Sequence, residues 1–426
     1  MKLKYIITWA ALSILALPAF AQDSAPKKIS SIMIIGNDHT NEDIIKRELR
    51  FGVGDTLNDS LLNVSKNRLL NLWIFNRVEM YKIPDQDEIS LLINVTERFS
   101  LFPYPEFRVE DRDWSKLTLG FGFAHMNFRG RNEKLYGSLL FGFRPGFKIG
   151  YFNPWAAGDL HLTTGLYIKK FTTEHRTLPL DEDHVTIGFA LGKYWTLHFY
   201  NMINFTYDQV SVLKEYAPQM LTGNDTETLN SLRLSTVLDT RDLYDYPSKG
   251  WYNRFVISKN GLFEPDIDYW QYITDLRHYR TFSPLTFAAR FYTLQSIGTL
   301  PLYQKVYIGF DERVRGHFFD IYEGRHSMLG SFEIRFPIKK LKYYNFASGI
   351  MPNYGTSNLK FGINGGLFID TGTVWTDRDG LSTQHLVTGF GAGLHFRLPY
   401  IQVLRIDAAF DEDLNSEMII ELGINF

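Results

Sequence analysis

The sequence has no cysteine, almost no net charge and, beyond its first residues, no long hydrophobic run. Without cysteine the chain can form no disulfide framework, no thiolate metal site and no cysteine nucleophile. A formal net charge of -2 gives it no basic surface for nucleic acid and no acidic tail. No later segment reaches the about 20 apolar residues that a membrane-spanning helix needs. We therefore expect a fold held by packing and backbone pairing, with no metal, no cofactor and no nucleic-acid partner.

Residues 1–21 have the layout of a secretory signal peptide. Lys2 and Lys4 precede an apolar run that ends at Leu17, and small residues follow up to Ala21. This succession predicts export from the cytoplasm, with cleavage after Ala21. A short membrane anchor is the alternative, although the apolar run is shorter than the about 20 residues of a spanning helix.

Residues 28–97 predict a small α/β module. Its expected elements are a strand over 29–35, a helix capped at 40–43, a helix over 56–72, and strands over 75–81 and 89–95. The strand end at Gly36-Asn37 and the Gly54-Asp55 pair between the helices resemble a POTRA domain, the polypeptide-transport-associated module. An unrelated small α/β domain is the alternative interpretation.

Residues 115–426 show no long helical period and instead alternate apolar with polar or small residues, up to the terminal Phe426. Alternation alone also fits a soluble sandwich, whose apolar side faces inward. The secretory start, 15% aromatic residues and 33 glycines favour a barrel whose apolar side faces lipid. At about 9 to 11 residues per strand, we predict a mainly β fold, a transmembrane antiparallel β-barrel of about sixteen strands. Residues 98–114 are interpreted as a linker.

Four short motifs lie in the β region behind the POTRA-like module. They are, in chain order, Leu238-Asp239-Thr240-Arg241-Asp242, Val314-Arg315-Gly316, Phe368-Ile369-Asp370-Thr371-Gly372 and Arg405-Ile406-Asp407. Together they resemble the BamA/TamA-type superfamily of outer-membrane assembly and translocation barrels, also called the bacterial surface antigen family. His317 departs from the family, which usually has Phe or Tyr after the lid motif. The resemblance implies a bacterial outer-membrane protein with its POTRA-like domain in the periplasm.

The resemblance also implies a lid loop at Val314-Arg315-Gly316, latched inside the barrel by pairing of Arg315 with Asp370 and, less directly, with Glu333. Strand parity separately puts Asp370 on the polar face of its strand. One guanidinium can bridge two carboxylates, and Gly316 lets the backbone approach the wall. Ordinary charge balance in the lumen is the alternative interpretation.

Barrel closure pairs the first strand with the last, and in the resembled family this seam is thought to loosen for client proteins. The predicted seam residues are Leu117 and Phe121 on the first strand, and Leu422, Gly423 and Phe426 on the last. Gly423 either weakens the last strand or merely fills space as a small lumen residue. The strand that ends in Phe426 resembles the signal that assembly machinery recognises in barrel clients. That machinery and the lipid bilayer are therefore predicted partners.

Unfolded client polypeptides are the third predicted partner, bound through the edge strand of the POTRA-like sheet and through the barrel seam. We predict a factor for protein insertion into, or translocation across, the outer membrane. A single POTRA-like module favours a dedicated or accessory factor; a general assembly factor and a passive channel are the alternatives. No enzyme is expected, because the adjacent His326-Ser327 pair points to opposite strand faces.

Overall fold

The computed structural model describes residues 27–109, 114–175, 177–308, 312–317, 320–346, 353–377, 380–381, 386–401 and 403–423. The predictions for the signal peptide at 1–21 and for Phe426 lie outside these residues. Within them, no helix is both long enough and apolar enough to cross a membrane.

The N-terminal module is a three-stranded sheet with two helices packed on it. Its elements are β1 (Ile29–Ile35), α2 (Glu42–Lys46), α3 (Asp59–Asn71), β2 (Phe75–Asp85) and β3 (Glu88–Glu97). β3 lies in the middle, parallel to β1 and antiparallel to β2. Asn58 caps α3 by accepting from the backbone N–H of Leu61 at 2.8 Å. Ile45, Leu69 and Ile93 belong to one shared core. The helices and strands therefore occur in the predicted order and pack around a single core.

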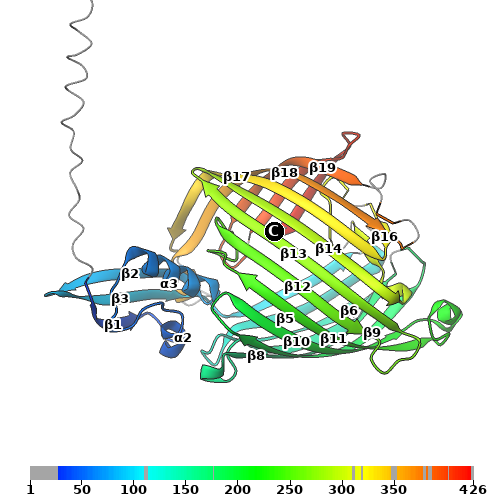
Figure 1. The fold of residues 1–426 in the computed structure, drawn as a ribbon, viewed down its shortest axis with the longest axis horizontal. Helices are drawn as coiled ribbons and strands as arrows, with labels where there is room; N and C mark the ends of the chain where they lie inside the picture. The colour runs from blue at the N-terminus through cyan, green and yellow to red at the C-terminus, as the bar shows by residue number, and fades with distance from the viewer. Residues whose placement is uncertain are drawn as a thin grey trace, which may run out of the picture.

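Among the described residues after the module, sixteen strands form one antiparallel sheet, which confirms the predicted fold class. The strands are β4 (Leu101–Val109), β5 (Leu117–Phe128), β6 (Glu133–Gly142), β7 (Gly146–Asn153), β8 (Leu162–Glu174), β9 (Asp181–Tyr194), β10 (Phe199–Ser211), β11 (Thr226–Asp239), β12 (Gly250–Asn260), β13 (Asp268–Phe282), β14 (Leu285–Thr299), β17 (His326–Tyr344), β18 (Leu359–Trp375), β19 (Val387–Arg397), β20 (Leu404–Phe410) and β21 (Ser416–Leu422). Figure 1 shows them running obliquely around a barrel, with the N-terminal module at one end.

The outer face of the barrel is apolar and its inner face is polar. In β18, Leu367 and Ile369 are about half exposed on the outer face of the barrel. Asp370, the residue that follows Ile369, is buried on the inner face. Glu333 and Arg335 of β17 are likewise buried inside. This arrangement is the reverse of a soluble sandwich and fits a barrel that faces lipid.

The linker interpretation of residues 98–114 is wrong in part, because β4 lies within it. β4 pairs with β5 from Leu101 opposite His125 to Val109 opposite Leu117. β4 is therefore the first strand of the barrel, and the predicted seam residues Leu117 and Phe121 lie on the second strand, β5. Two prolines in β4 obscure the strand in the sequence, since proline is tolerated within a sheet chiefly at its edge.

Between β14 and β17 the described residues form a small separate sheet. β15 (Val306–Ile308) and β16 (Tyr322–Gly324) pair as a separate two-stranded sheet. The remaining short elements are α4 (Asn353–Thr356) and the 3-10 helices η1 (Trp114–Lys116), η2 (Gly158–Leu160), η3 (Lys214–Gln219) and η4 (Leu302–Gln304).

The N-terminal module contacts two parts of the barrel rim. On one side, Asn127 Nδ2 donates to Thr40 Oγ1 at 2.9 Å, and the backbone N–H of Asn41 donates to the Gly130 carbonyl at 3.0 Å. On the other side, hydrogen bonds that involve side chains join the module to two loops of the barrel. Asn71 bonds to Asp242 and Tyr244. The loop before β18 is bonded through Asn76 to Ser357 and through Arg77 and Thr96 to Asn358. Because both sides are held, the module has a defined orientation on the barrel.

Gly130→Ala is expected to release the module from this rim contact. A Cβ at Gly130 would lie 2.1 Å from the carbonyl oxygen of His39, and its φ of 69° also strains an alanine. Overpacking of this kind costs about 1 to 3 kcal/mol, so we expect faster proteolytic cleavage between module and barrel. Gly223→Ala is the matched control, because Gly223 has the same φ with nothing within 4 Å. Equal cleavage rates in the two variants would show that the contact does not hold the module.

Candidate functional site

The lid segment, defined here as residues 312–317, lies between β15 and β16 against the inner wall of the barrel. Val314 is fully buried and packs with Ile308 of β15 and with Tyr292 and Leu329 of the wall. Apolar packing therefore fixes the middle of the segment inside an otherwise polar lumen.

Two glycines let this segment lie directly on the wall. Gly316 has a φ of 103°, and a Cβ there would lie 2.6 Å from the carbonyl oxygen of Phe410. A Cβ at Gly389 of β19 would lie only 1.6 Å from the carbonyl oxygen of Arg315. A side chain at either position would collide with backbone, so glycine is required on both sides of the contact.

Arg315 joins three carboxylates from three strands. Its Nε and Nη2 donate to the two carboxylate oxygens of Asp370, at 2.6 and 2.8 Å. Its Nη1 donates to Glu333 at 2.9 Å and to Asp407 at 3.3 Å. The guanidinium carbon lies 3.6 Å from the ring centroid of Phe368. Each of the four charged side chains is at most 1% exposed, so water does not screen these pairs.

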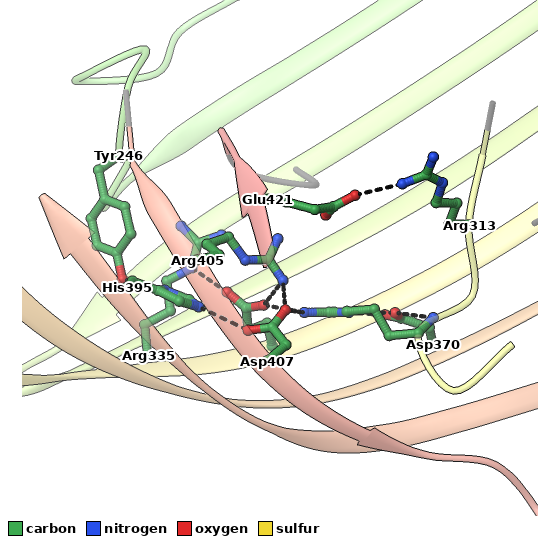
Figure 2. A network of polar contacts seen from close by, with 10 residues as sticks. Tyr246, Arg313, Arg335, Asp370, His395, Arg405, Asp407 and Glu421 are labelled. Atoms are coloured by element: carbon green, nitrogen blue, oxygen red, sulfur yellow. Dashed lines mark hydrogen bonds and ion pairs between the residues drawn. The ribbon is translucent and has the colours of Figure 1, made fainter. Parts of the chain in front are cut away.

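Two further arginines balance the charge of the cluster. Arg335 Nε donates to Glu333 at 2.6 Å, and Arg405 Nη2 donates to Asp407. Three guanidinium groups thus face three carboxylates, which gives the cluster no net charge. Figure 2 shows Arg335 and His395 at one end of the cluster, Asp370 at the other end, and Asp407 between them. Within the described residues, no three His, Asp or Glu side chains are arranged to hold a metal ion.

The N-terminal end of the lid segment forms ion pairs with two distant strands. Glu312 accepts two bonds from the Arg290 guanidinium of β14, at 2.8 and 2.9 Å. Arg313 Nη1 donates to Glu421 of β21 at 3.0 Å, and Figure 2 shows this pair apart from the main cluster. The segment therefore connects the middle of the barrel wall with its last strand.

The structure brings all five predicted latch residues together: Val314, Arg315, Gly316, Asp370 and Glu333. The seam residues are less well placed. Leu422 ends β21, but Gly423 follows the strand with a φ of 109°, so it lies at the strand end rather than weakening its middle.

Sequence reasoning assigned no part in the latch to several members of the cluster: Asp407, Arg335, Arg405, His395 and Tyr246. His395 Nδ1 lies 2.9 Å from the Tyr246 hydroxyl, beside the arginines. Two signals were available in the sequence. Arg335 follows Glu333 by two residues and so shares its strand face, and Arg405 and Asp407 share a face in the same way.

His317, where the resembled family has an aromatic residue, forms a link to the turn after β20. Its Nε2 lies 2.5 Å from Glu412 and its Nδ1 2.8 Å from Asp320. Burial alone would lower the pKa of His317, but its hydrogen bonds to Asp320 and Glu412 raise that pKa above the ordinary value.

Lid stability is therefore expected to fall as pH rises. A raised pKa means that the protonated imidazole stabilises the folded lid fully below about pH 6.5, and that this contribution is lost as pH rises through the raised value. The rate at which protease cleaves the lid segment should increase as pH rises from about 6.5 through the raised pKa of His317. In His317→Phe the cleavage rate should depend less on pH. A profile unchanged by that substitution would assign the pH dependence to other groups.

Comparisons with known families agree with this architecture. Residues 127–426 match the model of the Omp85 superfamily domain, and residues 27–98 match a POTRA model described as a surface antigen variable number repeat. The outer membrane protein assembly factor BamA of Nitratidesulfovibrio vulgaris is 22% identical over 315 residues, which cover 68% of this chain. The aligned part covers 37% of that relative's length.

Solved structures share the fold at low sequence identity. BamA from Haemophilus ducreyi, in a crystal structure lacking POTRA domains 1-3, is 16% identical with a TM-score of 0.54, and the match covers 93% of this chain and 83% of that one. CdiB from Escherichia coli is 11% identical with a TM-score of 0.52, and the match covers 96% of this chain and 91% of that one.

Proposed function

The chain belongs to the Omp85 superfamily, and on this premise we propose that it is a dedicated or accessory factor for inserting proteins into, or moving them across, the outer membrane. Its barrel lies in the outer membrane with the POTRA module in the periplasm. The BamA and CdiB relatives support insertion or translocation in general. One module, matched over residues 27–98, offers clients one set of sheet edges, which favours a narrow client range.

The observation that carries this proposal is the lid segment held by Arg315 on a buried, neutral charge cluster. We propose that this latch closes the lumen at rest and that client engagement releases it. The same segment is tied through Arg313 to Glu421 of the last strand, a connection that passive conduction of solutes does not require. The proposed role involves no covalent chemistry, so no residue is assigned as catalytic.

The free edge of β1 is the proposed first contact for clients. Among the described strands β1 pairs only with β3. At its other edge, Ile29 bonds through its N–H to the Asp55 carbonyl and through its C=O to the Gly54 N–H, and beyond Ile29 no described strand covers that edge. Met33 is 62% exposed and Ile35 41% exposed along this strand. An extended client can add to such an edge by backbone pairing, with apolar side chains supplying affinity.

The chain's own last strand supports two further partners. Met418, Ile420 and Leu422 are all exposed on the outer face of β21, where the bilayer lies. The same alternation supports the proposal that assembly machinery recognises this strand when the barrel itself is inserted. The terminal Phe426 of that predicted signal lies outside the described residues.

Depletion in the native host, followed by mass spectrometry of outer-membrane and secreted proteins, tests the proposed function. We expect one or a few surface or secreted proteins to be lost. A broad fall in barrel proteins would instead identify a general assembly factor. An unchanged protein inventory would contradict the proposal and favour a passive channel, whose steady conductance in planar bilayers would then be measured.

A further inference from the structure

A cavity of about 70 Å³ lies where the N-terminal module meets the barrel. Its lining includes Trp73 of the module, Arg98 of the segment between β3 and β4, and residues of β17, β18 and β19. Arg397 of β19 follows His395 by two residues and therefore lies on the same inner strand face. The cavity thus lies at the periplasmic mouth of the lumen, with room for several water molecules or one small oxyanion.

The charged side chains of this lining carry an excess of positive charge. Arg98, Lys360 and Arg397 are the cations, and Asp245 is the carboxylate. Three positive charges and one negative charge leave a net charge of +2. Lys360 Nζ donates to the Asp245 carboxylate, so the direct partner of that carboxylate is the lysine. The two arginines are left without an ion pair in the lining.

Both arginines also keep a buried donor without an acceptor. The Nε atoms of Arg98 and Arg397 are buried and have no hydrogen-bond partner within the part of the chain that the structure describes. Buried polar groups in proteins are nearly always hydrogen-bonded, and an unpaired donor on a charged group is especially costly. Two such donors at one cavity point to an acceptor that the chain itself does not supply.

Aromatic rings contact both guanidinium groups without satisfying their N–H donors. The Arg98 guanidinium carbon lies 4.9 Å from the ring centroid of Tyr400 and 5.1 Å from that of Trp73. The Arg397 guanidinium carbon lies 5.1 Å from the ring centroid of Tyr246. These contacts favour the positive charge through the ring faces, whereas guanidinium donors form a fork that suits carboxylate and phosphate oxygens. The rings therefore hold the two side chains in place and leave their hydrogen bonds to a ligand.

The pKa values of two groups outside the barrel strands agree with a positive field. Burial lowers the pKa of Arg98 to about 10, and Tyr400 and Asp245 offset this only in part. Burial alone would raise the pKa of Asp245, but Lys360 and Arg397 hold that pKa below its ordinary value. The cavity therefore favours a negative charge.

We propose that this cavity binds a phosphate group through Arg98 and Arg397, and that the bound group fastens the module to the mouth of the barrel. A phosphate dianion balances the net charge of +2, whereas one carboxylate balances half of it. Arg98 lies in the segment that leaves the module and Arg397 in the barrel wall, so one anion between them ties the two parts together. Free phosphate and the headgroup of a phosphomonoester lipid share this chemistry. The site is separate from the latch and from client contact, and it does not depend on the proposed function.

Proteolytic cleavage between module and barrel tests the site in the purified full-length protein in detergent. Inorganic phosphate should slow cleavage at least about threefold relative to chloride at equal ionic strength, because a ligand stabilises the state that binds it. Arg98→Gln and Arg397→Gln should each abolish this protection. Arg233→Gln is the matched control, because it removes the same charge from an arginine of β11 outside the cavity and should keep the protection.

Calorimetric titration of the wild-type protein with phosphate needs no variant and should show one site per chain. Three results would each overturn the proposal: no phosphate binding, protection that persists in both cavity variants, or equal protection by acetate. The last result would assign the cavity to carboxylates. Because none of these measurements involves a client, they succeed or fail separately from the depletion experiment.

Reconstitution in vesicles separates the two sources of phosphate. With phosphatidylcholine alone, protection that requires added inorganic phosphate would identify the free ion as the ligand. With phosphatidic acid included, protection without added phosphate would identify the lipid headgroup. Equal cleavage rates in all of these preparations would show that no anion fastens the module, and the proposal would be wrong.

Discussion

Arg315→Ala is expected to lower the free energy of unfolding by about 3 to 5 kcal/mol and to abolish protein assembly. The substitution leaves Asp370, Glu333 and Asp407 with two arginines in place of three, and all three carboxylates are at most 1% exposed. An uncompensated charge then stays buried, and the lid segment loses its main attachment. Guanidinium unfolding followed by tryptophan fluorescence measures the first effect, and complementation of the depleted host measures the second.

Two variants separate direct pairing from simple charge balance. Arg315→Lys keeps the charge but replaces a planar fork by a point charge, so it cannot reproduce bonds to three carboxylates and should recover only part of the loss. The exchange Arg315→Asp/Asp370→Arg keeps the total charge and restores opposite signs. If this double variant is no better than either single variant, the direct pairing of the two residues is unsupported.

The fold was accessible from the sequence because period and parity are local properties. Apolar residues at every second position predict a strand with one lipid face, and this rule also placed Asp370 inside. The element order of the N-terminal module followed from capping and helical spacing in the same way. β4 was not predicted because its two prolines interrupt the local strand pattern. The strand can nevertheless form, because proline is tolerated at the edge of a sheet, where its missing N–H has no partner in the ladder.

The charge cluster was accessible only in part because its partners are far apart in sequence. Arg313 and Glu421 are separated by 108 residues, and Arg315 and Asp407 by 92. The alternation of side chains along a strand predicts that a residue faces the lumen. It does not predict the position of that residue along the barrel axis, which depends on strand register and tilt. The family resemblance supplied the pair of Arg315 and Asp370, and for the remaining partners only the three-dimensional register brings the groups together.

Gly389→Ala is expected to displace the lid segment without altering any charge. The added Cβ would lie 1.6 Å from the carbonyl oxygen of Arg315 and 2.7 Å from its carbonyl carbon. Gly389 is also the direct partner of Asp370 in the β18–β19 register, so the collision occurs beside the latch. Both colliding atoms belong to backbone, and the segment must therefore move, at a cost of about 1 to 3 kcal/mol.

Loss of assembly in Gly389→Ala would show that the position of the lid, and not only the charge of the cluster, is required. The measurement is complementation of the depleted host together with protease sensitivity of the lid segment. Gly330→Ala on β17 is the control, because its nearest contact would be Thr371 Cγ2 at an ordinary 3.5 Å. If Gly389→Ala exposes the segment to protease and still restores every client, a docked lid is not needed for function. The buried cluster would then serve only to stabilise the barrel wall, and the functional part of the latch proposal would be wrong.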